Sequence, residues 1–278
     1  MISNLGDGAY SKVYKVKRIA DGQMYALKIV ALKNLSDKEK DNAINEVRIL
    51  ASIKHPNIIQ YKEAFMDKGS ESLCIVMELV DMGDLYGQIL KNLKRQGSSI
   101  PQAELEYEGL KEDFIWRVFI QVVKGLKSMH DLNIMHRDLK SANVFLNQDD
   151  TVKLGDMNVS KVATQEGLNF TQTGTPYYAS PEVWKDEPYD IKSDIWSLGC
   201  VLYEMITLKP PFQASSMKGL YKRVCQGKIQ RIPKSYSVEL WQVVKQMLHT
   251  NPKQRPDCTK ILESAIILSK EKQFMKKA

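Results

Sequence analysis

Apolar positions follow two different periods along the chain. Runs at residues 25–30 and 73–80 alternate or stay apolar, and each predicts a β-strand. Between them, Ser36 opens an acidic turn suited to a helix N-terminus, and apolar residues then recur three or four apart as far as Ala51. The pattern therefore predicts one helix among strands, ending before Pro56.

From Asp81 onward the spacing of apolar positions becomes helical. It predicts a long amphipathic helix over residues 114–129, an apolar helix over 194–207 and a further helix over 239–248. The polar and acidic stretch 96–112 predicts a surface loop between helices.

Together these elements predict an α+β fold in which one domain, residues 1–278, has two lobes. Residues 1–80 would form a small β-rich lobe with one main helix, and residues 81–278 a larger helical lobe. The junction between two such lobes is a common place for a ligand.

Composition narrows the class of protein. No apolar run reaches the roughly 18 residues that a membrane-spanning helix needs, so we expect no membrane partner. The cysteines form no Cys-x-x-Cys pair, which favours reduced thiols in an intracellular protein over a metal or redox site. They are Cys74, Cys200, Cys225 and Cys258.

The formal net charge is +7, which suggests acidic partners such as nucleotides, phosphoproteins or cytoskeletal surfaces. We attribute much of the excess to scattered lysines and to the lysine-rich stretch 270–277. Aromatic residues are not interleaved with the basic ones as they are in single-strand binders, so a solvated basic tail is favoured over a nucleic-acid-binding arm, and we expect no nucleic-acid partner.

Two features of the first lobe suit phosphate groups. Gly6 and Gly8 would let main-chain N–H groups approach phosphate oxygens, although a plain hairpin turn is the alternative. Lys28 lies inside an apolar strand and needs an anionic partner, since a lone buried ammonium is costly. Glu46, on the following helix, is the candidate partner; the alternative is an edge-strand lysine that reaches water.

The strongest chemical signal is residues 136–143, His-Arg-Asp-Leu-Lys-Ser-Ala-Asn. Asp138 can accept the proton of an incoming hydroxyl, and Lys140 can neutralise charge on a transferring phosphoryl group. Asn143 and, farther along, Asp156 can hold metal ions. These residues in this order predict phosphoryl transfer.

With these motifs in sequence, the chain resembles a eukaryotic protein kinase over nearly its whole length. The resemblance implies that Asp138 is the catalytic aspartate, aided by Lys140, Lys28 and Glu46, and that Asn143 and Asp156 are magnesium ligands. It also implies a set of ATP contacts: Leu5, Gly6 and Gly8 in the glycine-rich loop, Val13, Ala26 and Phe145 around the adenine, Met77 as gatekeeper, Glu78 and Val80 in the hinge, and Asp84 near the ribose.

The same resemblance extends beyond the ATP site. Glu182, in Ser-Pro-Glu, is expected to pair with Arg255, and residues 194–199 match the helix that anchors the catalytic loop. Thr175, in Gly-Thr-Pro-Tyr-Tyr, is expected to contact Asp138 and Lys140.

Further stretches narrow the resemblance. Lys140 and residues 174–178 resemble serine/threonine kinases rather than tyrosine kinases, and residues 45–52, 55–58 and 174–182 resemble NIMA-related kinases. This implies ATP and Mg²⁺, or Mn²⁺, as cofactors, and protein substrates with Ser or Thr acceptors for a monomeric domain. It also implies a role in cell-cycle, microtubule or ciliary regulation, with microtubule-associated or ciliary partners and a cytoplasmic, cytoskeletal or ciliary location, the nucleus being left open.

The chain departs from the family where Asp156-Met157-Asn158 replaces Asp-Phe-Gly. A flexible methionine can fill an aromatic pocket, and asparagine tolerates a positive φ better than other non-glycine residues. The departure keeps a second hypothesis open, a catalytically weak, pseudokinase-like nucleotide-binding scaffold. A small-molecule kinase is disfavoured because residues 174–182 resemble a peptide-positioning loop.

Regulation is expected next to the catalytic aspartate. Arg137 precedes Asp138, and an arginine there often pairs with a phosphate on the activation loop. Thr171 and Thr173 lie in the right stretch, and Thr171 is the preferred phosphorylation site by resemblance.

Overall fold

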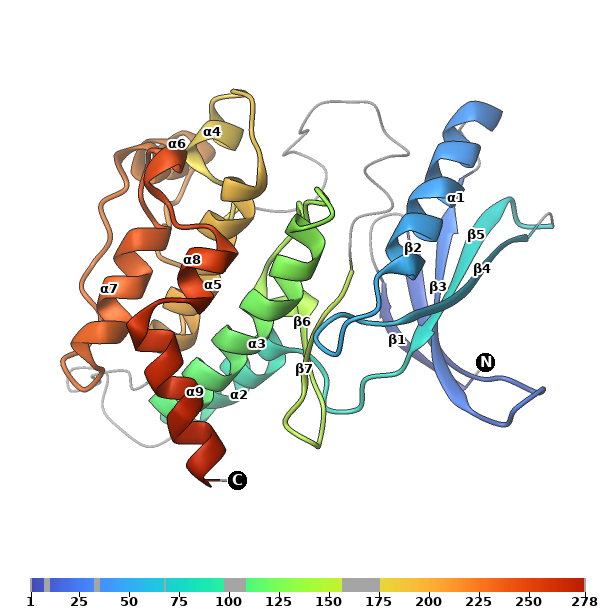
Figure 1. Cartoon of the computed structure of the whole chain (residues 1–278). Helices are drawn as coiled ribbons and strands as arrows, with labels where there is room; N and C mark the ends of the chain where they lie inside the picture. Colours follow the sequence, from blue (N-terminus) through green and yellow to red (C-terminus); the bar gives the residue numbers. More distant parts are fainter. Residues whose placement is uncertain are drawn as a thin grey trace.

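The computed structural model describes residues 2–7, 11–32, 36–67, 69–97, 109–156 and 176–277. Its first part is an antiparallel sheet in the order β1-β2-β3-β5-β4, with helix α1 packed next to β4 (Figure 1). The elements of this N-terminal lobe are β1 (Ser3–Asp7), β2 (Ser11–Lys17), β3 (Met24–Ala31), α1 (Asp37–Ser52), β4 (Tyr61–Asp67) and β5 (Ser72–Glu78).

Strands β3 and β5 form the centre of the sheet because they carry its most buried residues. In β3, Ala26, Lys28 and Val30 are buried and alternate with less buried neighbours, the period of two that a strand requires. In β5, every residue from Ser72 to Met77 is buried, and the strand pairs with β3 along its length. Lys28 therefore lies in the most buried pair of strands in this lobe.

The C-terminal lobe is built around α3 and α5, which carry long rows of buried residues. The hairpin β6–β7 lies between these helices and the sheet (Figure 1). The elements are α2 (Leu85–Gly97), α3 (Glu112–His130), the 3₁₀ turn η1 (Ser141–Asn143), β6 (Val144–Leu146), β7 (Val152–Leu154), α4 (Pro181–Trp184), α5 (Ile191–Thr207), α6 (Met217–Gln226), α7 (Val238–Met247), the 3₁₀ turn η3 (Pro252–Gln254), α8 (Cys258–Leu262) and α9 (Ala265–Lys277).

The α+β class and the division into a β-rich and a helical lobe are confirmed. Helix α5 begins at Ile191, before the predicted 194, because Asp190 caps it by accepting a hydrogen bond from the Lys192 main-chain N–H. The predicted strand 73–80 ends earlier, at Glu78. Among the described residues, no helix combines the length and apolar character needed to cross a bilayer.

The expectation of a surface loop over 96–112 is wrong at both ends. Helix α2 continues to Gly97, and Leu110 is buried, with its main-chain N–H donating to the Met205 carbonyl at 3.0 Å. A Cβ on Gly109 would lie 2.0 Å from the Ile206 carbonyl oxygen, so the chain here packs main chain against main chain on α5. The polar residues around Leu110 explain why the sequence did not indicate its burial. Residues 98–108 lie outside the described part of the chain.

The two lobes are joined at Asn57, in the loop after α1. Its carbonyl accepts the Leu154 main-chain N–H at 2.9 Å, and its side-chain amide donates to Gln121 and to the Val152 carbonyl, each at 2.9 Å. The loop approaches α3 so closely that a Cβ on Gly125 would lie 2.6 Å from the Asn57 carbonyl oxygen. A glycine is therefore required where the N-terminal lobe meets α3.

We expect Gly125→Ala to lower the free energy of unfolding by about 1–3 kcal/mol, because the added methyl group forces this loop away from α3. Denaturant unfolding measures the change. The control is Gly87→Ala in α2, where a Cβ would meet Asp84 Oδ1 at an ordinary 3.5 Å. That variant should be neutral or stabilised by up to about 1 kcal/mol, since alanine favours a helix. Equal stability of both variants would contradict the close approach.

Candidate active site between the two lobes

Asp138 stands at the centre of a small hydrogen-bonded group. Lys140 Nζ lies 3.0 Å from its Oδ2. Asn143 Nδ2 donates to the Asp138 carbonyl at 2.7 Å and to Oδ2 at 3.2 Å. The carboxylate is thus oriented by an ammonium and an amide while remaining partly exposed, as a proton acceptor for a bound hydroxyl must be.

Hydrogen bonds to Asp194 of α5 fix the loop that carries Asp138. Asp194 Oδ2 accepts the His136 main-chain N–H at 2.8 Å and faces His130 Nε2 at 2.9 Å, and Oδ1 accepts the Arg137 N–H at 3.0 Å. Burial alone would raise the pKa of Asp194, but these hydrogen bonds and the neighbouring imidazoles outweigh it and lower the pKa. An ionised, buried carboxylate therefore fixes the loop, including Arg137 at a φ of 65°.

The contact between Lys28 and Asp156 connects the N-terminal lobe to this loop. The buried Lys28 ammonium donates to Asp156 Oδ1, which satisfies the anionic partner predicted for that lysine. Asp156 has a φ of 53°, and the Gly155 N–H before it donates to the Asn143 carbonyl at 3.0 Å. A Cβ on Gly155 would lie 2.4 Å from Ile59 and 2.8 Å from Phe145, so a larger residue here would require these two side chains to move.

Asn143 and Asp156 suit a magnesium ion that also binds phosphate oxygens. Because Asn143 Nδ2 is used on Asp138, the amide oxygen is the atom left to face a cation. Mg²⁺ is usually held by one or two carboxylates together with substrate phosphates and water, so this sparse oxygen set fits it. No group of three or more His, Cys, Asp and Glu side chains suited to a metal occurs in the described ranges.

The residues expected around an adenine ring are brought together by the fold. Ala26 and Met77 are buried, and Val13, Val80 and Phe145 are partly buried members of the same apolar cluster. Two further expected contacts are nearby in the sheet: Gly6 of β1 pairs with Val13, and Leu5, half exposed, sits at the irregularity beside it.

Glu78 and Asp84 have structural contacts that the sequence did not reveal. The Glu78 carboxylate accepts the Gln60 N–H at 2.7 Å and pairs with Lys153 at 2.9 Å, so this side chain is already engaged within the protein. Asp84 accepts the Gly87 N–H at 2.7 Å and thereby caps α2. Its expected ribose contact would have to coexist with that cap.

Several predicted site residues lie outside the described part of the chain. The side chain of Glu46 is among them, so its expected pairing with Lys28 stays a prediction, whereas the pairing of Lys28 with Asp156 is observed. The others are Gly8, Met157, Asn158, Thr171, Thr173 and Thr175.

Comparison with known proteins identifies this arrangement. The family model of the protein kinase domain matches residues 1–267. The chain belongs to the protein kinase family. It is 41% identical to serine/threonine-protein kinase Nek1 of Mus musculus over 99% of this chain, and 38% identical to serine/threonine-protein kinase Nek2 of Homo sapiens over 96%. It is 34% identical to the G2-specific protein kinase nim-1 of Neurospora crassa over 99%.

These relatives confirm the predicted resemblance to NIMA-related kinases. The chain spans only part of their length: 22% of the mouse protein, 59% of the human protein and 34% of the Neurospora protein. The similarity therefore describes a kinase domain within longer relatives.

In this kinase domain the expected Glu182–Arg255 pair is formed. Arg255 Nη1 and Nη2 lie 2.6 Å and 2.8 Å from the two carboxylate oxygens, and Ser193 Oγ donates to the same carboxylate at 2.6 Å. The Arg255 guanidinium also lies 5.0 Å from the centre of the Trp196 ring. This buried group ties the segment around Glu182 to α5.

A second connection, which the sequence analysis missed, reaches the catalytic loop itself. Ser141 Oγ lies 3.1 Å from the Tyr178 hydroxyl, which donates to Glu204 at 2.7 Å. Burial raises the pKa of Glu204, and burial beside that carboxylate also raises the pKa of Tyr178. The only signal available beforehand was a glutamate inside the apolar run 194–207, where a buried acid requires a partner.

We expect Glu182→Gln to cost about 3–5 kcal/mol of unfolding free energy at neutral pH, because it leaves Arg255 buried without its counter-charge. Burial would raise the pKa of Glu182, but hydrogen bonds from Arg255 and Ser193 lower it from 4.5 to about 2. A depressed folded-state pKa contributes stability above 4.5 that is lost as the pH falls toward 2, so the deficit of the variant should shrink only below pH 4.5.

Denaturant unfolding across this pH range measures the deficit. The control is Glu187→Gln, whose exposed carboxylate lies 3.8 Å from Lys185 and should contribute within about 0.5 kcal/mol. Equal losses in the two glutamine variants at neutral pH would contradict a structural role for the buried pair.

Proposed function

We propose that this domain transfers the γ-phosphoryl group of Mg-ATP to serine or threonine hydroxyls of protein substrates. The observation that carries the proposal is the arrangement around Asp138, whose carboxylate is oriented by Lys140 at 3.0 Å and by Asn143 at 3.2 Å. Serine/threonine kinases among the similar proteins support the same reaction and acceptor.

In this mechanism Asp138 accepts the proton of the substrate hydroxyl as the oxygen attacks phosphorus. Hydrogen bonds from Lys140 and Asn143 direct its carboxylate, and the main-chain bonds to Asp194 prevent the loop from turning away. The phosphoryl transition state spreads negative charge over its oxygens, so positioning and positive charge supply most of the catalysis.

Lys140 is the cation next to the proton acceptor, and Lys28 brings a second one from the sheet. Asn143 and Asp156 would hold Mg²⁺, which neutralises charge on the β- and γ-phosphate oxygens when bound. The apolar cluster of Val13, Ala26, Met77, Val80 and Phe145 would take the adenine ring.

The pseudokinase alternative is not favoured. Lys28, Asp138, Asn143 and Asp156 are all present, and Asp156 is held next to Lys28 in the described structure. The replacement of glycine by Asn158 lies after these groups and removes none of them. Mn²⁺ could replace Mg²⁺ at an oxygen site of this kind.

The biological setting is also a proposal. We propose a monomeric domain that acts in cell-cycle, microtubule or ciliary regulation, with microtubule-associated or ciliary proteins as partners. The proposed location is the cytoplasm, its cytoskeleton or the cilium, with the nucleus left open. The name of the Neurospora relative, a G2-specific kinase, supports the cell-cycle role.

We expect Asp138→Asn to lower kcat by about 10²–10⁴-fold, because asparagine cannot accept the hydroxyl proton. Incorporation of radiolabel from ATP into a generic protein substrate measures the change. The control, Asp131→Asn, changes an exposed aspartate paired with Lys127 and should leave kcat unaltered. Equal labelling by the parent and the Asp138 variant would contradict the proposed catalytic role of Asp138.

We propose that phosphorylation of Thr171, with Thr173 as second choice, activates the kinase through Arg137. Arg137 is exposed while its main-chain N–H is fixed by Asp194, so the guanidinium can meet a phosphate without moving the loop. Phosphatase treatment should lower the activity of the parent severalfold and leave Thr171→Ala, which starts low, unchanged. Arg137→Ala should remove the phosphatase response as well; a full response in either variant would contradict the proposal.

A further inference from the structure

The positive charge of this chain is concentrated in one segment. Between Glu204 and Glu239 there are seven lysines and arginines and no aspartate or glutamate. Because the formal net charge of the whole chain is also +7, the basic and acidic residues elsewhere balance. This segment therefore contributes more to the excess than residues 270–277, which carry four lysines and one glutamate.

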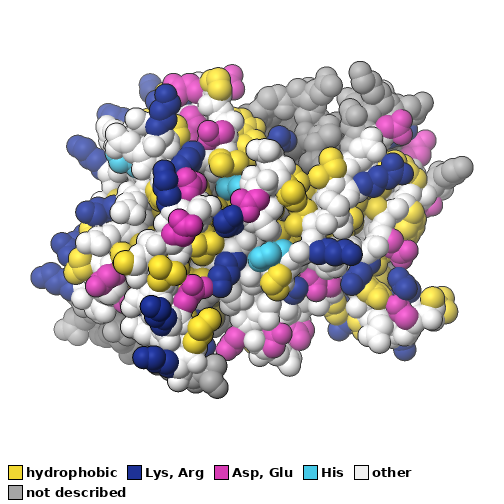
Figure 2. Space-filling view, viewed as in Figure 1, with side chains coloured by type: hydrophobic (Ala, Val, Ile, Leu, Met, Phe, Trp, Pro, Cys, Tyr) yellow, Lys and Arg dark blue, Asp and Glu magenta, His cyan; other side chains and the backbone are white. Residues whose placement is uncertain are grey.

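The segment forms an exposed face on the C-terminal lobe, over α6 and the loop that leads to α7. Figure 2 shows Lys and Arg side chains along the side of the molecule where these elements lie. All seven basic residues of the segment are exposed. The six that follow Lys209 take part in none of the ion pairs found within the described ranges. We call these six the basic face: Lys218, Lys222, Arg223, Lys228, Arg231 and Lys234.

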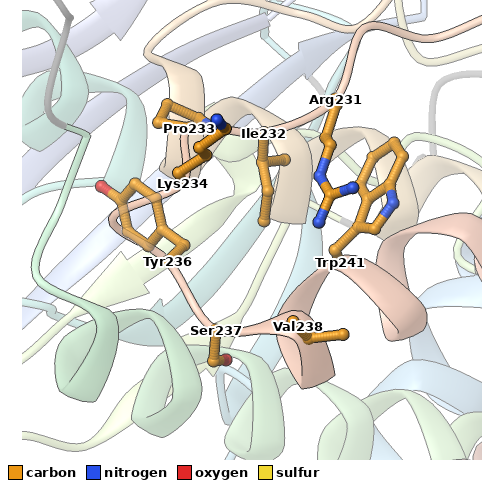
Figure 3. A pocket seen from close by; sticks show the side chains of 8 residues that line it. All are labelled: Arg231, Ile232, Pro233, Lys234, Tyr236, Ser237, Val238 and Trp241. Carbon is orange, nitrogen blue, oxygen red and sulfur yellow. The ribbon is translucent and has the colours of Figure 1, made fainter.

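A pocket opens at one end of the basic face. Its volume is about 200 Å³, and Arg231 and Lys234 line it together with Trp241 and Tyr236 (Figure 3). Its apolar lining comes from Ile232, which is buried, and from Pro233 and the exposed Val238. The pocket therefore combines two cations at its rim with aromatic and apolar walls.

Two carboxylates lie near this pocket, and neither neutralises its cations. Glu112 of α3 accepts the Ser237 main-chain N–H at 2.9 Å and also bonds the Ser237 hydroxyl and Trp116. Burial would raise the pKa of Glu112, but these hydrogen bonds outweigh it and lower the pKa. The negative charge of Glu112 is therefore compensated by groups inside the protein and not by the cations of the pocket. Glu239 is exposed on α7.

We propose that the basic face and this pocket form a docking site for an acidic peptide segment of a partner protein. A large apolar or aromatic side chain of that segment enters the pocket, and its flanking carboxylates meet Arg231 and Lys234. The face supplies long-range attraction for the acidic segment, and the pocket supplies the apolar contact that selects a side chain. The site lies away from Asp138 and is independent of the phosphoryl-transfer chemistry.

A protein partner fits these features better than a nucleic acid. Single-strand binders stack successive bases on open aromatic side chains along a basic groove. Here the aromatic residues Tyr236 and Trp241 line one small pocket together with Ile232 and Pro233. Such a pocket holds one side chain rather than a row of bases.

The test measures binding of a short fluorescent Glu-rich peptide that carries one phenylalanine, by anisotropy at low salt. The double variant Arg231→Ala/Lys234→Ala should bind about tenfold more weakly, since two rim charges are lost. The control, Lys54→Ala/Lys62→Ala, removes the same charge from exposed lysines of the N-terminal lobe and should bind like the parent. Replacing the phenylalanine of the peptide by glycine should also weaken binding to the parent.

A third variant tests the pocket itself. Val238→Glu puts a carboxylate at its rim, where the parent side chain is 56% exposed at the start of α7, a place that tolerates an acid. It should weaken peptide binding severalfold and leave phosphorylation of a small neutral peptide unchanged. That activity readout separates failure of this proposal from failure of the kinase function.

Equal weakening by the Lys54/Lys62 control and by the Arg231/Lys234 variant would overturn the proposal, because the attraction would then be one of net charge alone. Binding of an RNA oligonucleotide or of anionic lipid vesicles that depends on Arg231 and Lys234, with no binding of the peptide, would also overturn it.

Discussion

The geometry of the site depends on one buried carboxylate, Asp194. Taking a charge out of water is expensive, and this one is compensated by two main-chain N–H groups and an imidazole at 2.8–3.0 Å. Because those N–H groups belong to His136 and Arg137, the same bonds set the direction in which the chain enters Asp138. The unusual φ of 65° at Arg137 persists for the same reason: the bonds around it over-determine the backbone.

Main-chain hydrogen bonds also connect the catalytic loop to the N-terminal lobe. The Gly155 N–H reaches the Asn143 carbonyl at 3.0 Å, while Leu154 exchanges bonds of 2.8 and 2.9 Å with the Asn57–Ile59 stretch of the N-terminal lobe. The position of Asp156 relative to Lys28 is therefore set by backbone on both sides of the site. Side-chain substitutions around it should change charge and chemistry more readily than they change this framework.

The sequence predicted the elements that have a strong period and the site residues whose chemistry is unusual for their surroundings. Lys28 stood out as a charge within an apolar strand, and it is buried against Asp156. Leu110 did not stand out, because one apolar residue in an acidic stretch has no period, yet it anchors the chain to α5. The chain of Ser141, Tyr178 and Glu204 was also hidden, since its members come from three separate segments and meet only in the fold.

The distribution of charge is a further property that the overall composition does not reveal. The net charge of +7 does not show where the basic residues lie, whereas the stretch between Glu204 and Glu239, which has no acid, contains all six residues of the basic face. That face comes from a single continuous segment whose basic side chains are exposed, while the site draws on α5, the catalytic loop and the sheet. Substitutions on α6 and the following loop can therefore alter which partners the domain attracts without disturbing Asp194 or Asp138. The proposed attraction of a partner and the proposed transfer of phosphate are therefore separable, because they rest on different residues and on different physical forces.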